Sequence, residues 1–180
     1  MTDVDLFVKH SMQTLGHVPP TIFIHGENGK AMFGPQKLPD DRSKDEFVAL
    51  SRVMCIAHKA DATVLVTEAW MKSAKKGEKL DLKKQPSQYA DREEVVIMLG
   101  ETRAGCQQRI LPMLRADKGK FVGFGEERKI DAEKIKGRFA NFIPRIAPDE
   151  QNRTMAKLVL KKLGIDIERE QAKDRGLARF

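Results

Sequence analysis

Apolar residues three or four positions apart occur in two long segments of the chain and predict two amphipathic helices. The first helix is expected over residues 3–15, and Gly16 ends it. Ser43 and Glu46 have the spacing of a capping box, so a second helix is expected from there to residues 58–59.

Strand-like segments follow the first helix and fill the chain after the second. Residues 21–25 and 30–34 flank Asn28-Gly29, a pair that favours a tight hairpin turn because both residues tolerate positive φ. The apolar content of later segments predicts four more strands, over residues 62–71, 93–101, 106–115 and 121–124.

These elements predict an α+β fold, with helices packed on a mostly antiparallel sheet of about five to six strands. Strands 62–71 and 93–101 are apolar on both faces, which places them at the centre. Pro112 lacks an N–H, so it is expected at an edge or a bulge. The element order is similar to that of profilin-like and PAS-like folds, an analogy of topology that carries no function.

The last part of the chain differs in character, and we divide the chain into a core domain (1–128) and a basic helical C-terminal extension (129–180). A short helix is expected over 129–137, and a longer one from Pro148-Asp149-Glu150 to Leu163-Gly164. We expect the extension to dock on the body or on another protomer through exposed apolar residues, namely Phe139, Phe142 and Ile143.

Composition narrows the classes of function. No apolar run is long enough to span a bilayer and the first residues are acidic, so we expect a cytoplasmic protein. Cys55 and Cys106 have no CxxC partner and are expected to be reduced thiols. The four histidines lack the HxH or HExxH spacing of a zinc site, so we predict no metal, no cofactor and no catalytic residue. These histidines are His10, His17, His25 and His58.

The formal net charge of +7 is unevenly distributed. Residues 72–84 carry +4 and residues 129–180 carry +5, which leaves −2 for the rest of the chain. Clustered positive charge favours an anionic partner, either a nucleic acid or an acidic protein. The predicted binding residues are the lysines of the basic loop 72–84: Lys72, Lys75, Lys76, Lys79, Lys83 and Lys84.

Glu68 is the one charged residue in an otherwise apolar strand segment. Because it alternates with Val64, Val66 and Trp70, we expect it to be partly buried and paired with Arg92 or a loop lysine. A general acid–base site is the alternative hypothesis. In that case Glu68 would act with Glu94, Glu101 or His25.

The segment from Val66 to Met71, with Pro86-Ser87 and the run from Asp91 to Val95, resembles a pattern in small uncharacterised proteins of bacteria and their mobile elements. The resemblance covers residues 62–101, about a fifth of the chain, and implies a bacterial or phage origin but no activity. It also implies a polar cluster in which an Arg–carboxylate bridge ties the loop ends: Glu68, Trp70, Asp91, Arg92 and Glu93.

Three hypotheses of function follow. The favoured one is a non-enzymatic binding or accessory protein whose basic loop and C-terminal extension contact an anionic partner. The second is a small enzyme with a carboxylate or histidine site around Glu68. The third is a homo-oligomeric assembly subunit or ligand sensor that associates through the C-terminal extension.

Overall fold

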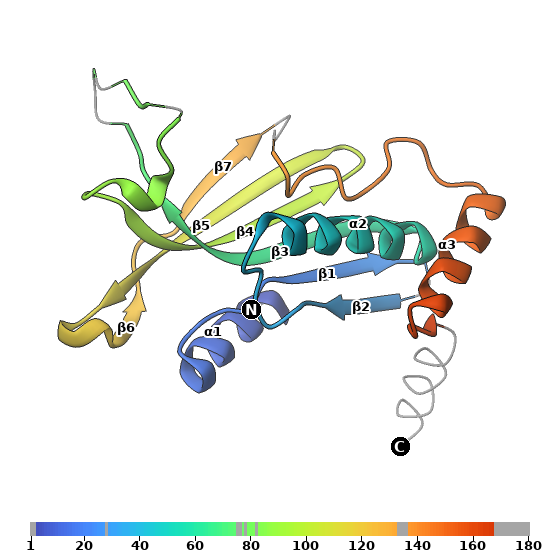
Figure 1. Ribbon diagram of the computed structural model, residues 1–180, viewed down its shortest axis with the longest axis horizontal. Coiled ribbons are helices and arrows are strands. Elements are labelled where there is room, and N and C mark those ends of the chain that lie inside the picture. The colour runs from blue at the N-terminus through green and yellow to red at the C-terminus, as the bar shows by residue number, and fades with distance from the viewer. Residues whose placement is uncertain are drawn as a thin grey trace.

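The fold was determined from a computed structural model, which describes residues 3–27, 29–74, 77, 79–81, 83–132 and 137–167. Within these residues, seven strands form one curled antiparallel sheet in the order β2-β1-β3-β4-β5-β6, and β7 also pairs with β5 (Figure 1). The helices are α1 (Asp3–Leu15), α2 (Asp41–Ala57) and α3 (Glu150–Lys162). The strands are β1 (Thr21–Gly26), β2 (Gly29–Phe33), β3 (Ala60–Met71), β4 (Glu93–Thr102), β5 (Gly105–Arg115), β6 (Phe121–Phe124) and β7 (Arg128–Ala132). The predicted α+β class is confirmed.

The centre of the sheet is the β3–β4 pair, as the apolar patterns predicted. Leu65 lies opposite Leu99, and the next pair, Val66 and Met98, points to the other face. All four side chains are buried. Because neighbouring residues on a strand alternate between faces, this burial requires a cover on both sides of the sheet.

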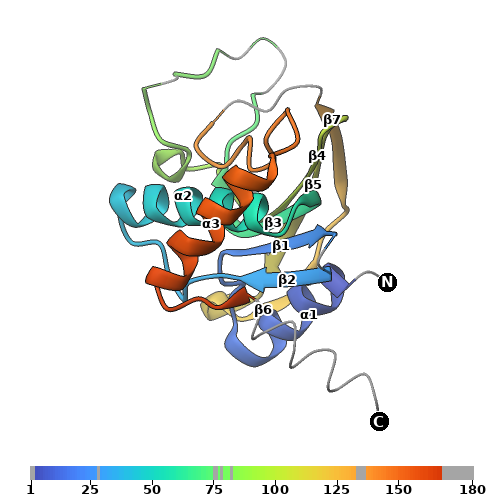
Figure 2. The same ribbon diagram turned by 90° about the vertical axis from the view of Figure 1, so that its right-hand side faces the viewer.

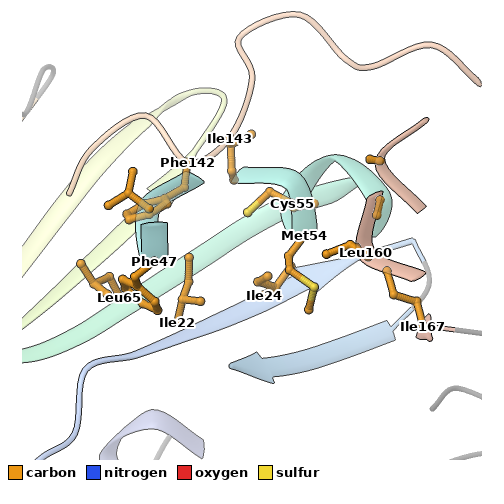
Figure 3. Close-up of a cluster of buried hydrophobic side chains, with 14 of the residues drawn as sticks. Ile22, Ile24, Phe47, Met54, Cys55, Leu65, Phe142, Ile143, Leu160 and Ile167 are labelled. Atoms are coloured by element: carbon orange, nitrogen blue, oxygen red, sulfur yellow. The ribbon is translucent and has the colours of Figure 1, made fainter. Parts of the chain in front are cut away.

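α2 and α3 lie together on one face, which we call the α2 face (Figure 2). There Phe47 and Met54 of α2 and Leu160 of α3 belong to one buried cluster with Leu65 of β3 (Figure 3). Full burial of such a side chain contributes roughly 1.5–3 kcal/mol. The hydrophobic effect therefore holds α3 to the same core as α2.

α1 covers the opposite face, which we call the α1 face. Its buried residues Val8 and Met12 pack in one cluster with Val66, Met98 and Met113. The aromatic rings of Phe7 and Phe23 meet edge to face there, with centroids 5.2 Å apart. Within the described residues, no helix is long and apolar enough to cross a membrane.

The predicted cap of the second helix was wrong by one turn. Asp40 is the N-cap: its carboxylate accepts from the Ser43 amide at 2.7 Å, and the Ser43 hydroxyl accepts from the Asp40 amide. Glu46 instead pairs with Arg42. An ionised carboxylate also interacts favourably with the positive end of the helix dipole, which favours Asp40 as the cap.

The short helix predicted over 129–137 was wrong as well. Residues 128–132 form β7, which pairs with the Cys106–Ile110 part of β5, and residues 133–136 lie outside the described part of the chain. Pairing of β7 satisfies the hydrogen-bonding groups of the β5 backbone. This stabilisation comes from residues distant in the sequence, so local helix propensity does not predict it.

Pro112 was predicted at an edge or a bulge, but it lies on an inner strand, opposite Val95 of β4, at the point where β5 changes partners on its other side. β7 pairs with β5 as far as Ile110, and β6 pairs with it from Met113 onward. Between the two, the Pro112 carbonyl accepts from the Gly125 amide at 2.8 Å.

The longer C-terminal helix, α3, is confirmed. The Asp149 carboxylate caps it by accepting from the Asn152 amide at 2.7 Å, and Gly164 follows its end at φ 81°. Phe142 and Ile143 were expected on an exposed contact surface, but they are 1% and 4% exposed and belong to the core. Residues 137–167 therefore dock on the body of their own chain.

Candidate functional site

The base of the basic loop is tied between β3 and β4. Lys72 Nζ lies 2.8 Å from Asp91 Oδ2, and the Lys72 side chain is only 3% exposed. The Tyr89 hydroxyl donates to the carbonyl of Asp81, and Lys84 Nζ lies 4.4 Å from the centroid of the Tyr89 ring. In Figure 1 this loop projects away from the sheet.

Trp70 and Arg92 form a stacked pair at the foot of this loop. The Arg92 guanidinium carbon lies 4.5 Å from the centroid of the Trp70 ring. Arg92 also donates to the Tyr89 carbonyl at 3.1 Å, which fixes the guanidinium. Trp70 is 44% exposed and Arg92 is exposed as well, so this pair, which we call the Trp70–Arg92 stack, is accessible from solvent.

The acids nearest the stack each have a cationic partner. Glu93 pairs with Arg128, and Glu94 pairs with both nitrogens of the Arg115 fork. The resemblance implied an Arg–carboxylate bridge between the loop ends, whereas the structure places Lys72 and Asp91 there. Because Arg128 and Arg115 balance the charges of Glu93 and Glu94, these acids repel an approaching anion less than unpaired carboxylates would.

The six lysines predicted to bind fall into three groups. Lys72 is buried against Asp91 and supports the loop. Lys79, Lys83 and Lys84 are exposed. Lys75 and Lys76 lie outside the described residues. Of the three exposed lysines, Lys84 is linked to the Trp70–Arg92 stack through Tyr89.

A hollow of about 570 Å³ lies next to the stack, between the start of β4 and the part of β5 around Pro112. Arg92 and Arg128 line it, together with Leu114 and Glu94. Sequence reasoning missed this hollow, because the partner change of β5 and the position of Arg128 on β7 both depend on non-local strand pairing.

Glu68 is half-buried as predicted, but its partner differs from the predicted one. One carboxylate oxygen accepts from the backbone amide of Val18 at 2.7 Å. Burial raises the pKa of Glu68, and the nearby charge of Glu94 adds to this, while the Val18 amide opposes it. Glu68 therefore anchors the segment between α1 and β1.

Of the residues proposed for an acid–base site with Glu68, only Glu94 lies near it. Glu94 shares the α1 face with it, but Arg115 holds the Glu94 carboxylate. Glu101 points to the α2 face and accepts from two backbone amides. His25 lies opposite Ala62, six residues along β3 from Glu68, or about 20 Å.

Two further reactive residues, Cys55 and His58, are buried. Burial raises the pKa of Cys55 to about 12, which keeps the thiol protonated and unreactive. His58 is 3% exposed, and no hydrogen-bond partner is found for either ring nitrogen among the described residues. Across the described ranges, no group of three or more His, Cys, Asp or Glu side chains is arranged to hold a metal ion.

Comparison with protein-family models, curated proteins and solved structures finds no match to this chain. The likeness of its element order to profilin-like and PAS-like folds accordingly stays an analogy. The structure defines the class as an α+β protein with a curled antiparallel sheet, and a function has to be inferred from the residues of the chain itself.

Proposed function

We propose that this protein is a non-enzymatic nucleic-acid-binding or accessory protein that contacts its partner through the basic loop and the C-terminal helix. The observation that carries the proposal is the Trp70–Arg92 stack at the foot of the loop. An exposed aromatic ring with a planar cation offers a surface on which a base stacks, a contact worth about 1–3 kcal/mol per base.

The exposed lysines supply the complementary contact with phosphates. Lys84 is linked to the stack, because it contacts the Tyr89 ring and Arg92 donates to the Tyr89 carbonyl. Lys83 precedes it in the chain and is exposed. A chain of alternating bases and phosphates can then use the ring and the lysines together. An acidic peptide could contact the lysines, but it has no nucleobase to stack on the Trp70 ring. The stack therefore favours a nucleic acid as the partner.

The second basic region lies far from the first. In Figure 1 the loop and α3 are at opposite ends of the long axis of the molecule. The last turn of α3 carries Lys161 and Lys162, both exposed. A partner that touches both regions has to be extended, which suits a polynucleotide better than a small anion.

Trp70 is the only tryptophan of the chain, so its fluorescence reports on the stack directly. We would titrate the protein with oligo(dT), a random duplex and poly-glutamate across a range of salt concentrations. We expect oligo(dT) to quench Trp70 and to bind with an affinity that falls steeply with salt. Binding of poly-glutamate with no binding of oligo(dT) would point to an acidic protein partner and overturn the proposal.

The matched variants remove equal charge from two places. The double variant Lys83→Ala/Lys84→Ala is expected to bind oligo(dT) about tenfold more weakly and to lower the slope of log affinity against log salt by roughly 1.4. The control Lys9→Ala/Lys37→Ala removes two exposed lysines of α1 and the segment before α2, and it is expected to bind nearly as the parent does. Equal losses in both variants would show a non-specific charge effect.

The contribution of α3 to binding can be separated from that of the basic loop by comparing long and short oligonucleotides. Because the two basic regions lie apart, Lys161→Ala/Lys162→Ala is expected to weaken binding of a long oligonucleotide and to leave a short one unaffected. An equal effect on both lengths would contradict an extended partner.

A further inference from the structure

A second cavity, which we call the N-terminal cavity, opens on the α1 face beside the first turn of α1. It measures about 380 Å³, within the range of sites that hold small organic ligands. Most of its wall is apolar and comes from α1, β1 and β3: Val4, Phe23, Ala62 and Val64. The apolar wall suits the hydrocarbon part of a ligand.

The rim of the N-terminal cavity carries the polar groups, Asp3, His25 and Lys30. His25 and Lys30 are directly opposite each other across β1 and β2, so their side chains emerge on the same face. Lys30 Nζ lies 2.6 Å from Asp3 Oδ2, and both of these side chains are largely exposed, at 72% and 68%. An exposed ion pair of this kind gives little stability and is readily rearranged.

Two of the three polar side chains at the opening carry nitrogen donors, which suits an anionic head group. An ammonium has three N–H donors, and Asp3 occupies one of those of Lys30. The imidazole of His25, on the same side, offers an N–H in either tautomer. Asp3 keeps acceptor sites of its own, but Lys30 balances its charge, so a ligand carboxylate would be held by the remaining N–H groups of Lys30 and by His25.

We propose that the N-terminal cavity binds a small carboxylic acid with an apolar body. The hydrocarbon part lies against Phe23, Ala62 and Val64, and the carboxylate accepts hydrogen bonds from Lys30 and His25. This site is independent of the nucleic-acid proposal: Ala62 and Met71 are nine residues apart on β3, which separates the cavity from the loop by roughly 30 Å.

Three probes of equal chain length and different head group test the proposal on the full chain. Octanoate, octan-1-ol and octylamine would be titrated separately, with binding followed by NMR shifts of the Phe23 and Val64 resonances. We expect octanoate to shift these resonances and to bind about tenfold more tightly than the alcohol or the amine. Absence of octanoate binding at millimolar concentration, or equal binding of all three, would overturn the proposal.

Two variants and a control locate the ligand. Lys30→Met keeps the length of the side chain and removes its charge, and it is expected to weaken octanoate binding about tenfold. Ala62→Leu fills part of the cavity and is expected to weaken all probes that bind. Lys9→Met makes the same change at an exposed position of α1 away from the rim and should have no effect. Unchanged octanoate binding in both cavity variants would refute the N-terminal cavity as the binding site. If either variant fails to fold, the comparison of the three probes on the unmodified protein tests the proposal.

Discussion

The carboxylate of Glu101, on the central strand β4, accepts a hydrogen bond from the backbone amide of Phe142, 41 residues further along the chain, at 3.1 Å. Its second oxygen accepts from the Ile143 amide at 3.0 Å. Glu101 is 6% exposed, and the segment that it holds carries two buried apolar side chains into the core. This single carboxylate therefore satisfies two buried donors and holds residues 142–143 against β4.

Replacing Glu101 is expected to destabilise the protein strongly. Glu101→Ala leaves the amides of Phe142 and Ile143 without acceptors, and each buried unpaired donor costs about 1–3 kcal/mol. We expect the free energy of unfolding, measured by urea denaturation, to fall by about 2–4 kcal/mol. Glu126→Ala, a truncation at an exposed position, serves as the control. A loss under 0.5 kcal/mol, the range of ordinary surface changes, would contradict this role of Glu101.

His58 makes stability depend on pH. Burial first, and then the positive charges of Arg153 and Lys157, hold the pKa of His58 below its usual value of 6.5. The unfolded chain therefore binds the proton more readily, and the free energy of unfolding falls as pH drops below 6.5 toward the lower folded-state pKa. The slope of this loss is at most about 1.4 kcal/mol per pH unit.

The corresponding experiment compares unfolding at pH 7.5 and pH 5 in the parent, in His58→Leu and in His10→Leu. His58→Leu is expected to lose less stability on acidification than the parent, because it has no imidazole to protonate there. His10 is exposed on α1, so its variant should follow the parent. Identical pH dependence in all three proteins would exclude His58 as the cause.

Glu68 contributes a pH dependence of stability that is opposite in sign to that of His58. Burial raises its pKa, so the folded state binds a proton more tightly than the unfolded chain, and the ionised carboxylate costs stability above the folded-state pKa. Glu68→Gln keeps an oxygen to accept from the Val18 amide and removes the charge. We expect this variant to be more stable than the parent at pH 7 and to lose that advantage below pH 4.5. A variant less stable than the parent at pH 7 would show that the ionised form is needed.

Gly26 lies at the end of β1, against the backbone that follows α2. A Cβ at position 26 would stand 2.4 Å from the His58 carbonyl oxygen and 2.8 Å from that of Lys59. Gly26→Ala is therefore expected to lower the free energy of unfolding by about 1–3 kcal/mol. Gly105→Ala is the matched control in another strand, since a Cβ there meets nothing within 4 Å. Similar thermal unfolding of the two variants would argue against a clash at Gly26.

The elements that periodicity predicted well are those with strong local signals. Four kinds of element lie near their expected positions: α1, the two hairpin strands, β3 and β4. Burial of an apolar face determines where these elements form, and the sequence pattern shows such faces directly. The turn residue Asn28 lies outside the described residues. β7 was missed because a strand of that composition forms only where β5 offers an unpaired edge.

The candidate site was partly accessible to sequence reasoning. Alternation along β3 placed Glu68 and Trp70 on one face and predicted the partial burial of Glu68. The burial of Lys72 could not be read from its lysine-rich surroundings, since it depends on Asp91 across a long loop. The hydrogen bond from the Val18 amide to Glu68 could not be predicted either, because nearly every residue has a backbone N–H and the residue type does not show which one donates.

The partner change of β5 at Pro112 has a consequence for self-association. The long strands β3, β4 and β5, of 12, 10 and 11 residues, pair with neighbours on both sides, while the sheet ends on β2, β6 and β7, of 5, 4 and 5 residues. Short edge strands offer a poor template for the addition of a foreign strand. The division of β5 between β6 and β7 at Pro112 thus leaves two short strands on this side of the sheet, an arrangement that disfavours edge-to-edge addition of a foreign strand.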